Sequence, residues 1–353
     1  MKVFNTLDTV FNALGRFFKN VPYAGYGLFL LLLWLIPLFH SVDVISSGQL
    51  GIFAYIVVIT VAALGLNILL GFSGLISLGT AGFVGAGALG VGVFLDLGLP
   101  FELAAIATLI VSTALGALIG LFSLKVEGIY LAIATLFVGE ILRQIFTTVP
   151  IFGGQSIMIG SVTLFGFIEL STFSQSERRV LFAIIAALLV GMMILMQHIV
   201  KSKTGRALLA MSRSSSAAQA MGVSLLKYRL MAFSLATFFA TFSGIMYALY
   251  NQSVPTTQWT LDLSLFVIAM VVVGGYKSIY GTFIGAFIIY GIPNLYLKDL
   301  FGDVSYIFSG LLIILVILFY QNGVAYLAVD IRLLYAKLKR RIHGGSHGKA
   351  PLD

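Results

Sequence analysis

Hydrophobic residues fill this sequence in long blocks, and polar residues are confined to the short stretches between them. A helix needs about 20 apolar residues to cross a bilayer, and ten blocks approach that length. Two of them are short, and short or glycine-broken spans often line a transport path. An eight-span alternative omits those two, 79–96 and 262–276, and keeps the same ends. The predicted spans are 24–42, 49–71, 79–96, 101–124, 128–147, 179–199, 226–250, 262–276, 279–297 and 304–320.

The composition agrees with a membrane protein. Of the 353 residues, 59% are hydrophobic and only 10% are charged, whereas soluble domains carry about 25% charged residues. The mean hydropathy is +1.05. There is no cysteine, which excludes disulfides and thiolate metal sites. We predict an all-α polytopic membrane protein with about ten transmembrane helices, some of them short and broken, and no cofactor.

The basic residues indicate how the chain is oriented. The stretch 201–229 carries six Lys and Arg and no acidic residue, which places it in the cytoplasm. With both termini on that side, the cytoplasmic segments hold three basic residues before residue 24, Lys125, these six, Lys277 and six after residue 320. They account for 17 of the 21 in the chain. The net charge of +8 then reflects loops that face anionic lipid and a partner, with no role in binding nucleic acid.

Three regions follow from this pattern. Residues 1–23 are predicted to form an amphipathic helix on the inner face of the membrane. Residues 24–323 form the transmembrane domain, and 324–353 form a basic cytoplasmic helix and tail. We expect a multi-pass protein of the inner (plasma) membrane with both termini in the cytoplasm.

The central loop has helix signals of its own. Thr204 can cap a helix that begins at Gly205, because its hydroxyl can accept a free amide proton of the first turn. Ser216 can cap a second helix over 217–221, which Gly222 would end in a left-handed turn. The pattern predicts one or two short helices on the cytoplasmic surface, and the alternative is a solvated loop.

Two polar groups lie inside predicted spans. Glu140 and Arg143 are three residues apart and can pair on one helix face. They line a transport path or form a pair near the membrane surface, and the sequence does not separate these readings. Ser73, Ser77 and Thr80 lie among glycines in 71–90, where an unwound segment would offer hydroxyls and free amides at mid-depth. A glycine-rich packing seam is the alternative there.

Asp262 is interpreted as an interfacial helix N-cap. The sequence contains no catalytic constellation and no phosphate-binding motif of the type G-x-x-x-x-G-K-[ST], so we expect neither an enzyme nor an ATPase site of its own.

At these motifs the chain resembles the permease subunits of branched-chain amino acid ABC importers of the LivM type. The resemblance covers about residues 50–325. It rests on the stretch from Gly74 to Ala88, on G-I-Y-L-A-I-A-T-L-F-V-G-E-I-L-R at 128–143 and on G-R-A-L-L-A-M-S-R at 205–213 with the A-A-Q-A-M-G that follows. It is supported by Ser243-Gly244 and by Val273-Gly274-Gly275.

The resemblance implies a permease that translocates branched-chain amino acids with energy from separate subunits. It implies a homologous LivH-type permease, two cytoplasmic ATPase subunits and an external substrate-binding protein as partners, in addition to membrane lipid. It also implies that the central loop is the segment that couples to the ATPases, through Gly205, Arg206, Ala207, Leu208, Met211, Arg213, Ala217, Ala218 and Gly222. The predicted substrate path comprises Ser73, Ser77, Thr80, Glu140 and Arg143.

Three other functions stay open at this point. Importers of urea and short amides use similar permeases. A self-contained secondary transporter would need intramembrane carboxylates for ion coupling, and Glu140 is the only central candidate. The third alternative is a structural or assembly protein of the membrane.

Overall fold

The computed structural model describes residues 23–298 except 43, 123–127, 153, 161, 165–167 and 171–173. After residue 298 it describes only 302, 310, 311, 314, 318, 323 and 324. The predicted helix over 1–23 lies outside the described residues apart from Tyr23. So do most of the last predicted span and nearly all of the C-terminal region.

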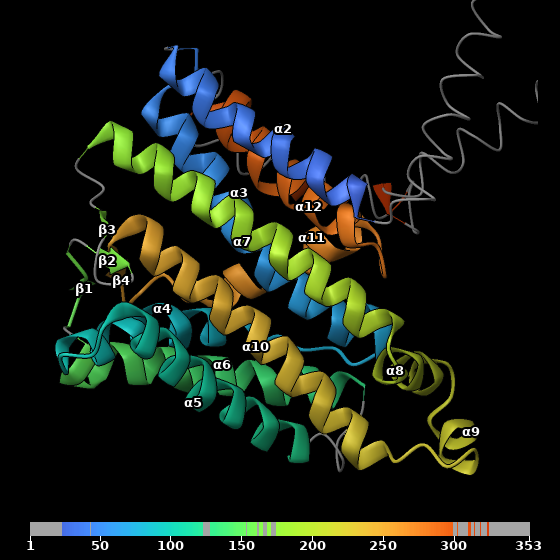
Figure 1. Cartoon of the computed structure of the whole chain (residues 1–353). Helices are drawn as coiled ribbons and strands as arrows, with labels where there is room; N and C mark the ends of the chain where they lie inside the picture. Colours follow the sequence, from blue (N-terminus) through green and yellow to red (C-terminus); the bar gives the residue numbers. More distant parts are fainter. Residues whose placement is uncertain are drawn as a thin grey trace, which may run out of the picture.

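Eleven α-helices make up the described part of the chain (Figure 1). They are α2 (Ala24–Ser41), α3 (Ser47–Asn67), α4 (Thr80–Asp96), α5 (Phe101–Phe122), α6 (Ile129–Thr148), α7 (Gln175–Lys201), α8 (Lys203–Arg213), α9 (Ser215–Ala220), α10 (Leu225–Asn251), α11 (Leu261–Gly274) and α12 (Ile279–Ala286). Two π-helical turns, Phe287–Gly291 and Pro293–Leu297, continue α12, and a third, Ile68–Phe72, continues α3.

Nine of the ten predicted spans correspond to helices in the described residues. Seven helices are long and apolar enough to cross a membrane, counting α3 and α12 with their π-helical turns. The other two, α4 and α11, are apolar but shorter. The all-α prediction is therefore confirmed for the described membrane part, and the two helices that fall short, α4 and α11, are the two spans that were predicted to be short.

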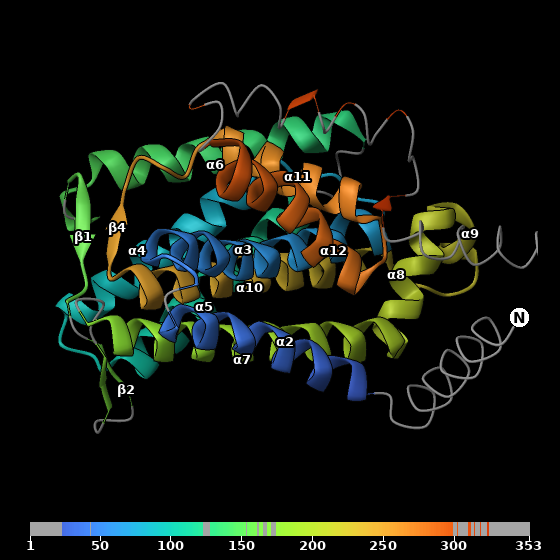
Figure 2. The same ribbon diagram turned by 90° about the horizontal axis from the view of Figure 1, so that it is seen from above.

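Helix α3 occupies the centre of the bundle. Its residues are apolar on every side, and 83% of its span is buried inside the protein, as expected for a helix without a polar face. It packs against α7, α10, α11 and α12. Figure 2 shows α3 surrounded by these helices, with α2 lying outside it against α7.

Glycines let α4 approach its neighbours closely. A Cβ atom on Gly244 of α10 would lie 1.9 Å from the carbonyl oxygen of Val84, and one on Gly87 would lie 2.1 Å from that of Thr241. On the other side of α4, a Cβ on Gly82 would lie 2.9 Å from the Cα of Gly139. The glycine-rich packing seam considered from the sequence is thus present, because small residues let membrane helices pack backbone to backbone.

Short strands close the end of the bundle opposite α8 and α9. Strand β1 (Ser156–Met158) pairs antiparallel with β4 (Ser253–Pro255), and β2 (Val162–Leu164) pairs with β3 (Ile168–Leu170). No strand was predicted here from the sequence. Each has three residues, too few to show the alternation by which strands are recognised in a sequence. We call this the strand end of the bundle, and the opposite one the α8 end.

The predicted helix caps of the central loop are wrong by two residues each. Ser202, not Thr204, accepts a hydrogen bond from the amide of Gly205 and begins α8. Ser214, not Ser216, begins α9 by accepting from the amide of Ala217. The left-handed turn at Gly222 is confirmed, with φ of +83°.

Candidate functional site

The segment between α3 and α4 crosses part of the bundle without regular structure. Where this segment meets α4, two backbone amides donate to side-chain hydroxyls of other helices, because irregular backbone at membrane depth needs such partners. The amide of Leu78 donates to the hydroxyl of Thr135 on α6 at 2.9 Å. The amide of Ala81, in the first turn of α4, donates to the hydroxyl of Ser264 on α11 at 3.0 Å. Helix α4 therefore begins inside the bundle and not at its surface.

Helix α11 begins inside the bundle as well, but its preceding segment arrives from the opposite end. The chain leaves β4 at the strand end and runs beside α6 before α11 starts (Figure 2). Because Ser264 bonds to Ala81, the first turns of α4 and α11 meet in the interior. This explains why both helices are short: each is preceded by a non-helical segment that enters the membrane region. Paired broken helices whose starts meet at mid-depth are typical of transporter binding sites.

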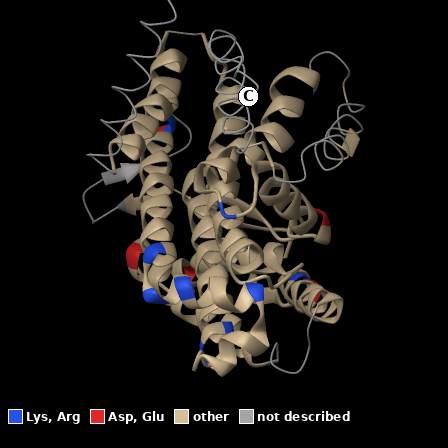
Figure 3. Ribbon diagram, turned by 90° about the vertical axis from the view of Figure 1, so that its right-hand side faces the viewer, with Lys and Arg blue, Asp and Glu red and all other residues tan. Residues whose placement is uncertain are grey.

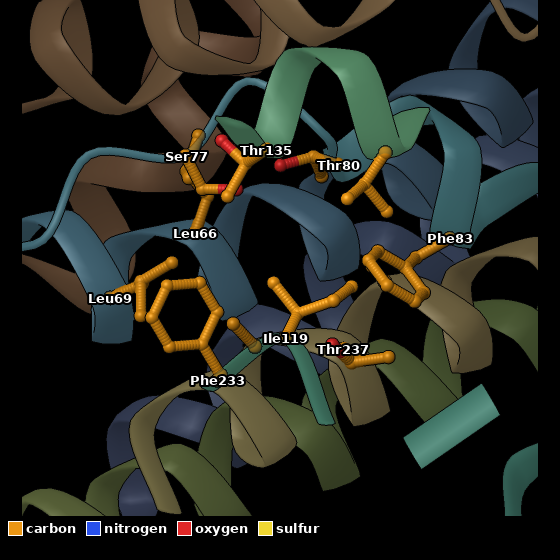
Figure 4. A pocket seen from close by; sticks show the side chains of 12 residues that line it. Leu66, Leu69, Ser77, Thr80, Phe83, Ile119, Thr135, Phe233 and Thr237 are labelled. Carbon is orange, nitrogen blue, oxygen red and sulfur yellow. The ribbon is translucent and has the colours of Figure 1, made fainter. Parts of the chain in front are cut away.

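The junction is lined by hydroxyl groups on one side. A small pocket between α3, α4, α5, α6 and α10 is lined by four of them, from Ser77, Thr80, Thr135 and Thr237, and by apolar side chains (Figure 4). All four are buried. The space open at its centre is about 20 Å³, which is room for one water molecule. The pocket offers polar contacts inside an otherwise apolar bundle but is too small, as it stands, for an amino acid.

A larger pocket lies on the other side of the same segment. Leu78, Ala81 and Gly82 line it together with Glu140 of α6, and the start of α11 completes it with Trp259, Thr260, Leu261 and Ser264. The volume of this cavity is about 240 Å³. The segment 77–82 is thus a thin wall between the two pockets.

Glu140 and Arg143 form the predicted pair. The Nε atom of Arg143 donates to both carboxylate oxygens of Glu140, at 3.0 and 2.9 Å, and a third hydrogen bond joins Nη2 to Oε1. The pair remains open to the outside of this chain, with 46% of the Glu140 side chain and 27% of the Arg143 side chain exposed.

Four of the five predicted path residues lie near this junction, and the fifth does not. Ser77 and Thr80 line the small pocket, Glu140 lines the large one, and Arg143 reaches it through Glu140. Ser73 is buried at the end of the π-helical turn after α3, where its hydroxyl donates to the carbonyl of Leu69. It therefore lines neither of these two pockets.

Helices α8 and α9 project from the other end of the bundle, where Lys and Arg gather (Figure 3). The predicted coupling residues divide into two groups there. Gly205, Ala207, Leu208, Met211 and Ala218 are buried and face the protein's own helices. Arg206, Arg213, Ala217 and Gly222 are exposed. Only the second group can meet a partner while α8 and α9 keep their packing.

The buried side of α8 contacts the segment that leads to the pockets. A Cβ atom added to Gly74, whose φ is +72°, would lie 3.4 Å from both Cα and Cβ of Ser212. Gly74 is therefore in direct contact with α8, three residues before Ser77. Movement of α8 would reach the wall between the two pockets through a short stretch of irregular chain.

Comparisons with known proteins identify the family. Residues 49–317 match the model of the branched-chain amino acid transport system / permease component family. The chain belongs to this family. The high-affinity branched-chain amino acid transport system permease protein LivM of Salmonella typhimurium is 31% identical over 301 residues, which cover 79% of this chain and 70% of that protein.

Two further relatives extend the comparison. The LivM protein of Escherichia coli is 30% identical over the same length of alignment. The probable branched-chain amino acid transport permease protein LivH of Methanocaldococcus jannaschii is 32% identical over 163 residues, which are 44% of this chain and 46% of that protein. No solved structure matches the chain significantly. The chain is thus a transmembrane permease component without an ATPase domain, as the sequence analysis expected.

Sequence reasoning missed the parts of the junction that depend on two distant segments. The hydroxyl of Thr135 accepts a hydrogen bond from the amide of Leu78, and that of Ser264 accepts one from the amide of Ala81. Neither residue is unusual in the sequence of its own helix. Asp262 was interpreted as an N-cap at the membrane surface. Instead Thr260 occupies the N-cap position, and Asp262 lies in the first turn of a helix that begins inside the bundle. The shortness of the two apolar blocks indicated that α4 and α11 are unusual. It did not indicate that the first turns of these two helices meet.

Proposed function

We propose that this chain is one of two permease subunits of an ATP-driven importer of branched-chain amino acids in the inner membrane. The family membership carries the proposal, because the relatives are permease proteins of branched-chain amino acid transport systems. A homologous LivH-type permease, two ATPases and an external binding protein complete the assembly. The α8 end faces the cytoplasm, since Lys and Arg concentrate there.

The ATPase binds the exposed side of α8 and α9 in this proposal. Arg206, Ala210 and Arg213 form a stripe along α8, and α9 adds small residues around Ala217. Met221 follows α9 and is 86% exposed. A large apolar side chain that is so exposed beside small residues is typical of a contact that another protein buries. The buried residues Leu208 and Met211 anchor α8 to the bundle, and Ser212 carries the movement of α8 to Gly74.

The substrate passes beside the junction of α4 and α11. Glu140 and Arg143 supply both signs of charge and Ser264 a hydroxyl, which are the groups that a zwitterionic amino acid needs. The small hydroxyl-lined pocket behind the wall widens when the 73–79 segment moves. Each ATPase cycle displaces α8, and through Gly74 it shifts the wall between the two pockets.

The test is uptake by the chain expressed together with the genes that flank its own, in cells that lack their own leucine transport system. We expect uptake of radiolabelled leucine that excess isoleucine or valine inhibits and excess urea does not. Met221→Asp should reduce ATPase copurification by tenfold or more, about 1.4 kcal/mol of binding, and should abolish uptake. Leu97→Asp, which alters a similarly exposed residue near the strand end, is the matched control and should leave both unchanged.

Either of two results would contradict the proposal. Inhibition by urea alone would assign the chain to a urea or amide importer. Leucine uptake that continues without any copurifying ATPase would favour a secondary transporter.

A further inference from the structure

The exposed faces of the membrane helices differ in character. Those of α2 and α5 carry large apolar residues, such as Leu31 (60% exposed) and Ile110 (65% exposed). In the described membrane helices other than α6 and α11, every Asp, Glu, Lys and Arg lies within five residues of a helix end. Such faces suit a lipid environment, because charges at helix ends reach the headgroup region.

The face formed by α6 and α11 is different. Glu140 and Arg143 are the twelfth and fifteenth residues of the 20-residue helix α6, and both side chains are partly exposed. Asp262 is exposed in the first turn of α11. Large apolar side chains surround these charges. We call this surface the α6–α11 face; its members are Phe137, Glu140, Ile141, Arg143, Asp262, Leu265 and Phe266.

The charges of this face lie at similar depths. With a rise of 1.5 Å per residue, Glu140 lies roughly 16 Å along α6 from the α8 end. Asp262 lies roughly 18 Å from the last residue of α11 by the same rule. The hydrocarbon core of a bilayer is about 30 Å thick. Both carboxylates therefore lie about half the thickness of a bilayer core from the end of their helix on the α8 side, although Asp262 is close to a helix start.

Lipid is a poor cover for this surface. A charged side chain at the centre of a bilayer costs about 2.5–3.5 kcal/mol or more. The ion pair of Glu140 with Arg143 reduces that cost for two of the three charges. Asp262 gains from the helix dipole at the start of α11, but it forms no salt bridge to any described residue. The face carries one net negative charge. The molecule that covers it must therefore supply a positive charge or a hydrogen-bond donor.

We propose that the second permease subunit packs on the α6–α11 face and places a basic or hydrogen-bond-donating side chain opposite Asp262. This inference rests on the proposed function, because that function supplies the second permease. The large pocket at Glu140 opens beside this face. It then becomes half of a passage whose other half belongs to the partner, while α2 and α5 face lipid.

Photo-crosslinking in membranes tests the contact without knowledge of the partner's structure. A benzophenone amino acid replaces Phe137 or Leu265 on the proposed interface. In the control variants it replaces Leu31 or Ile110. The chain is expressed together with the genes that flank its own, and the crosslinked products are identified by mass spectrometry. We expect a crosslink to the second permease from positions 137 and 265, and products with lipid only from positions 31 and 110.

The outcomes separate this inference from the proposed function. A second permease that copurifies but crosslinks to positions 31 or 110, and not to 137 or 265, would overturn the interface and leave the function intact. A crosslink from 137 or 265 only to a second copy of this chain, or only to another segment of the same chain, would also overturn it. A chain that copurifies with no other permease would overturn both proposals.

A charge reversal tests the group opposite Asp262. Asp262→Lys should reduce copurification of the second permease at least tenfold, because it would oppose a basic or donor group. Asp262→Asn should have a smaller effect, since the amide can still accept a hydrogen bond. Asp96→Lys, at the exposed end of α4, is the matched control and should leave copurification unchanged. Unchanged copurification with Asp262→Lys would remove the complementary charge from the proposal.

Discussion

Single glycines decide how closely the helices around the junction approach one another. Gly244 has backbone atoms of α4 where a Cβ would be, whereas Gly51 in α3 has no atom within 4 Å of that position. We predict that Gly244→Ala destabilises the protein by about 1–3 kcal/mol, because α4 and α10 must separate. Gly51→Ala is the control and should be neutral or slightly stabilising, since alanine favours a helix.

Thermal unfolding of the purified protein in detergent measures the difference between these two variants. Equal melting temperatures would show that α4 and α10 tolerate a wider separation than their packing indicates.

Substitutions at Glu140 and Arg143 can distinguish a role of these charges in transport from a role of their ion pair in stabilising α6. Glu140→Gln leaves Arg143 without its carboxylate, and we predict that leucine uptake falls at least tenfold. In the double variant Glu140→Gln, Arg143→Gln, neither of these two positions carries an unpaired charge. If the pair only stabilises α6, the double variant should recover uptake. If the two charges line the path, as we propose, it should not.

Transport assays on membranes with equal amounts of assembled complex measure this effect. Asp96→Asn removes a carboxylate at the end of α4 and is the control, with uptake unchanged. Normal uptake by Glu140→Gln would remove the residue from the path.

Among the elements, the long spans were predictable and the starts of the short helices were not. Apolar blocks define α3, α7 and α10 because burial in the membrane needs no other information. Around α8 and α9 several serines and one threonine compete as caps within a few residues. The chosen ones, Ser202 and Ser214, are those that let α8 bury its apolar side on the bundle, which is a tertiary effect that local propensity does not contain.

Because one side of α9 is buried, a substitution in α9 can affect either the stability of the permease or its binding to the ATPase. Ala218 is 5% exposed, whereas its neighbour Ala217 is exposed. We predict that Ala218→Asp destabilises the permease itself, because a carboxylate would be buried without a partner. Ala217→Asp should leave the permease stable and weaken only its binding to the ATPase.

Melting temperatures of the permease alone and ATPase copurification distinguish the two effects of the α9 variants. A stable Ala218→Asp permease that lacks ATPase binding would mean that α9 turns its buried side outward on docking.

For the whole molecule, the sequence predicted which polar residues lie near the junction better than how they are arranged there. Glu140 and Thr80 were recognised because charges and hydroxyls are unusual inside apolar blocks. The meeting of α4 with α11 joins residues about 180 positions apart, Ala81 and Ser264. Local patterns carry no information on such a pairing. Thr135 and Ser264 each contribute one hydroxyl to the junction. A hydroxyl within a membrane helix ordinarily bonds to a backbone carbonyl of its own helix, so these two residues do not stand out in the sequence.

The orientation of the whole molecule is the last prediction, and the absence of cysteine makes it testable with single substitutions. Met221 follows α9 and is 86% exposed, while Met158 in β1 at the strand end is 75% exposed. We predict that a membrane-impermeant maleimide labels Met158→Cys, and not Met221→Cys, on spheroplasts. Inverted membrane vesicles should give the opposite result. The cause is the concentration of Lys and Arg around α8 and α9, which keeps that end in the cytoplasm.

The chain without cysteine controls for background labelling, and detergent-solubilised protein should react at both positions. Labelling of Met221→Cys on spheroplasts would place α8 and α9 outside the cell. It would separate them from any cytoplasmic ATPase, and the α8 contact with Gly74 could then no longer couple ATP hydrolysis to the pockets.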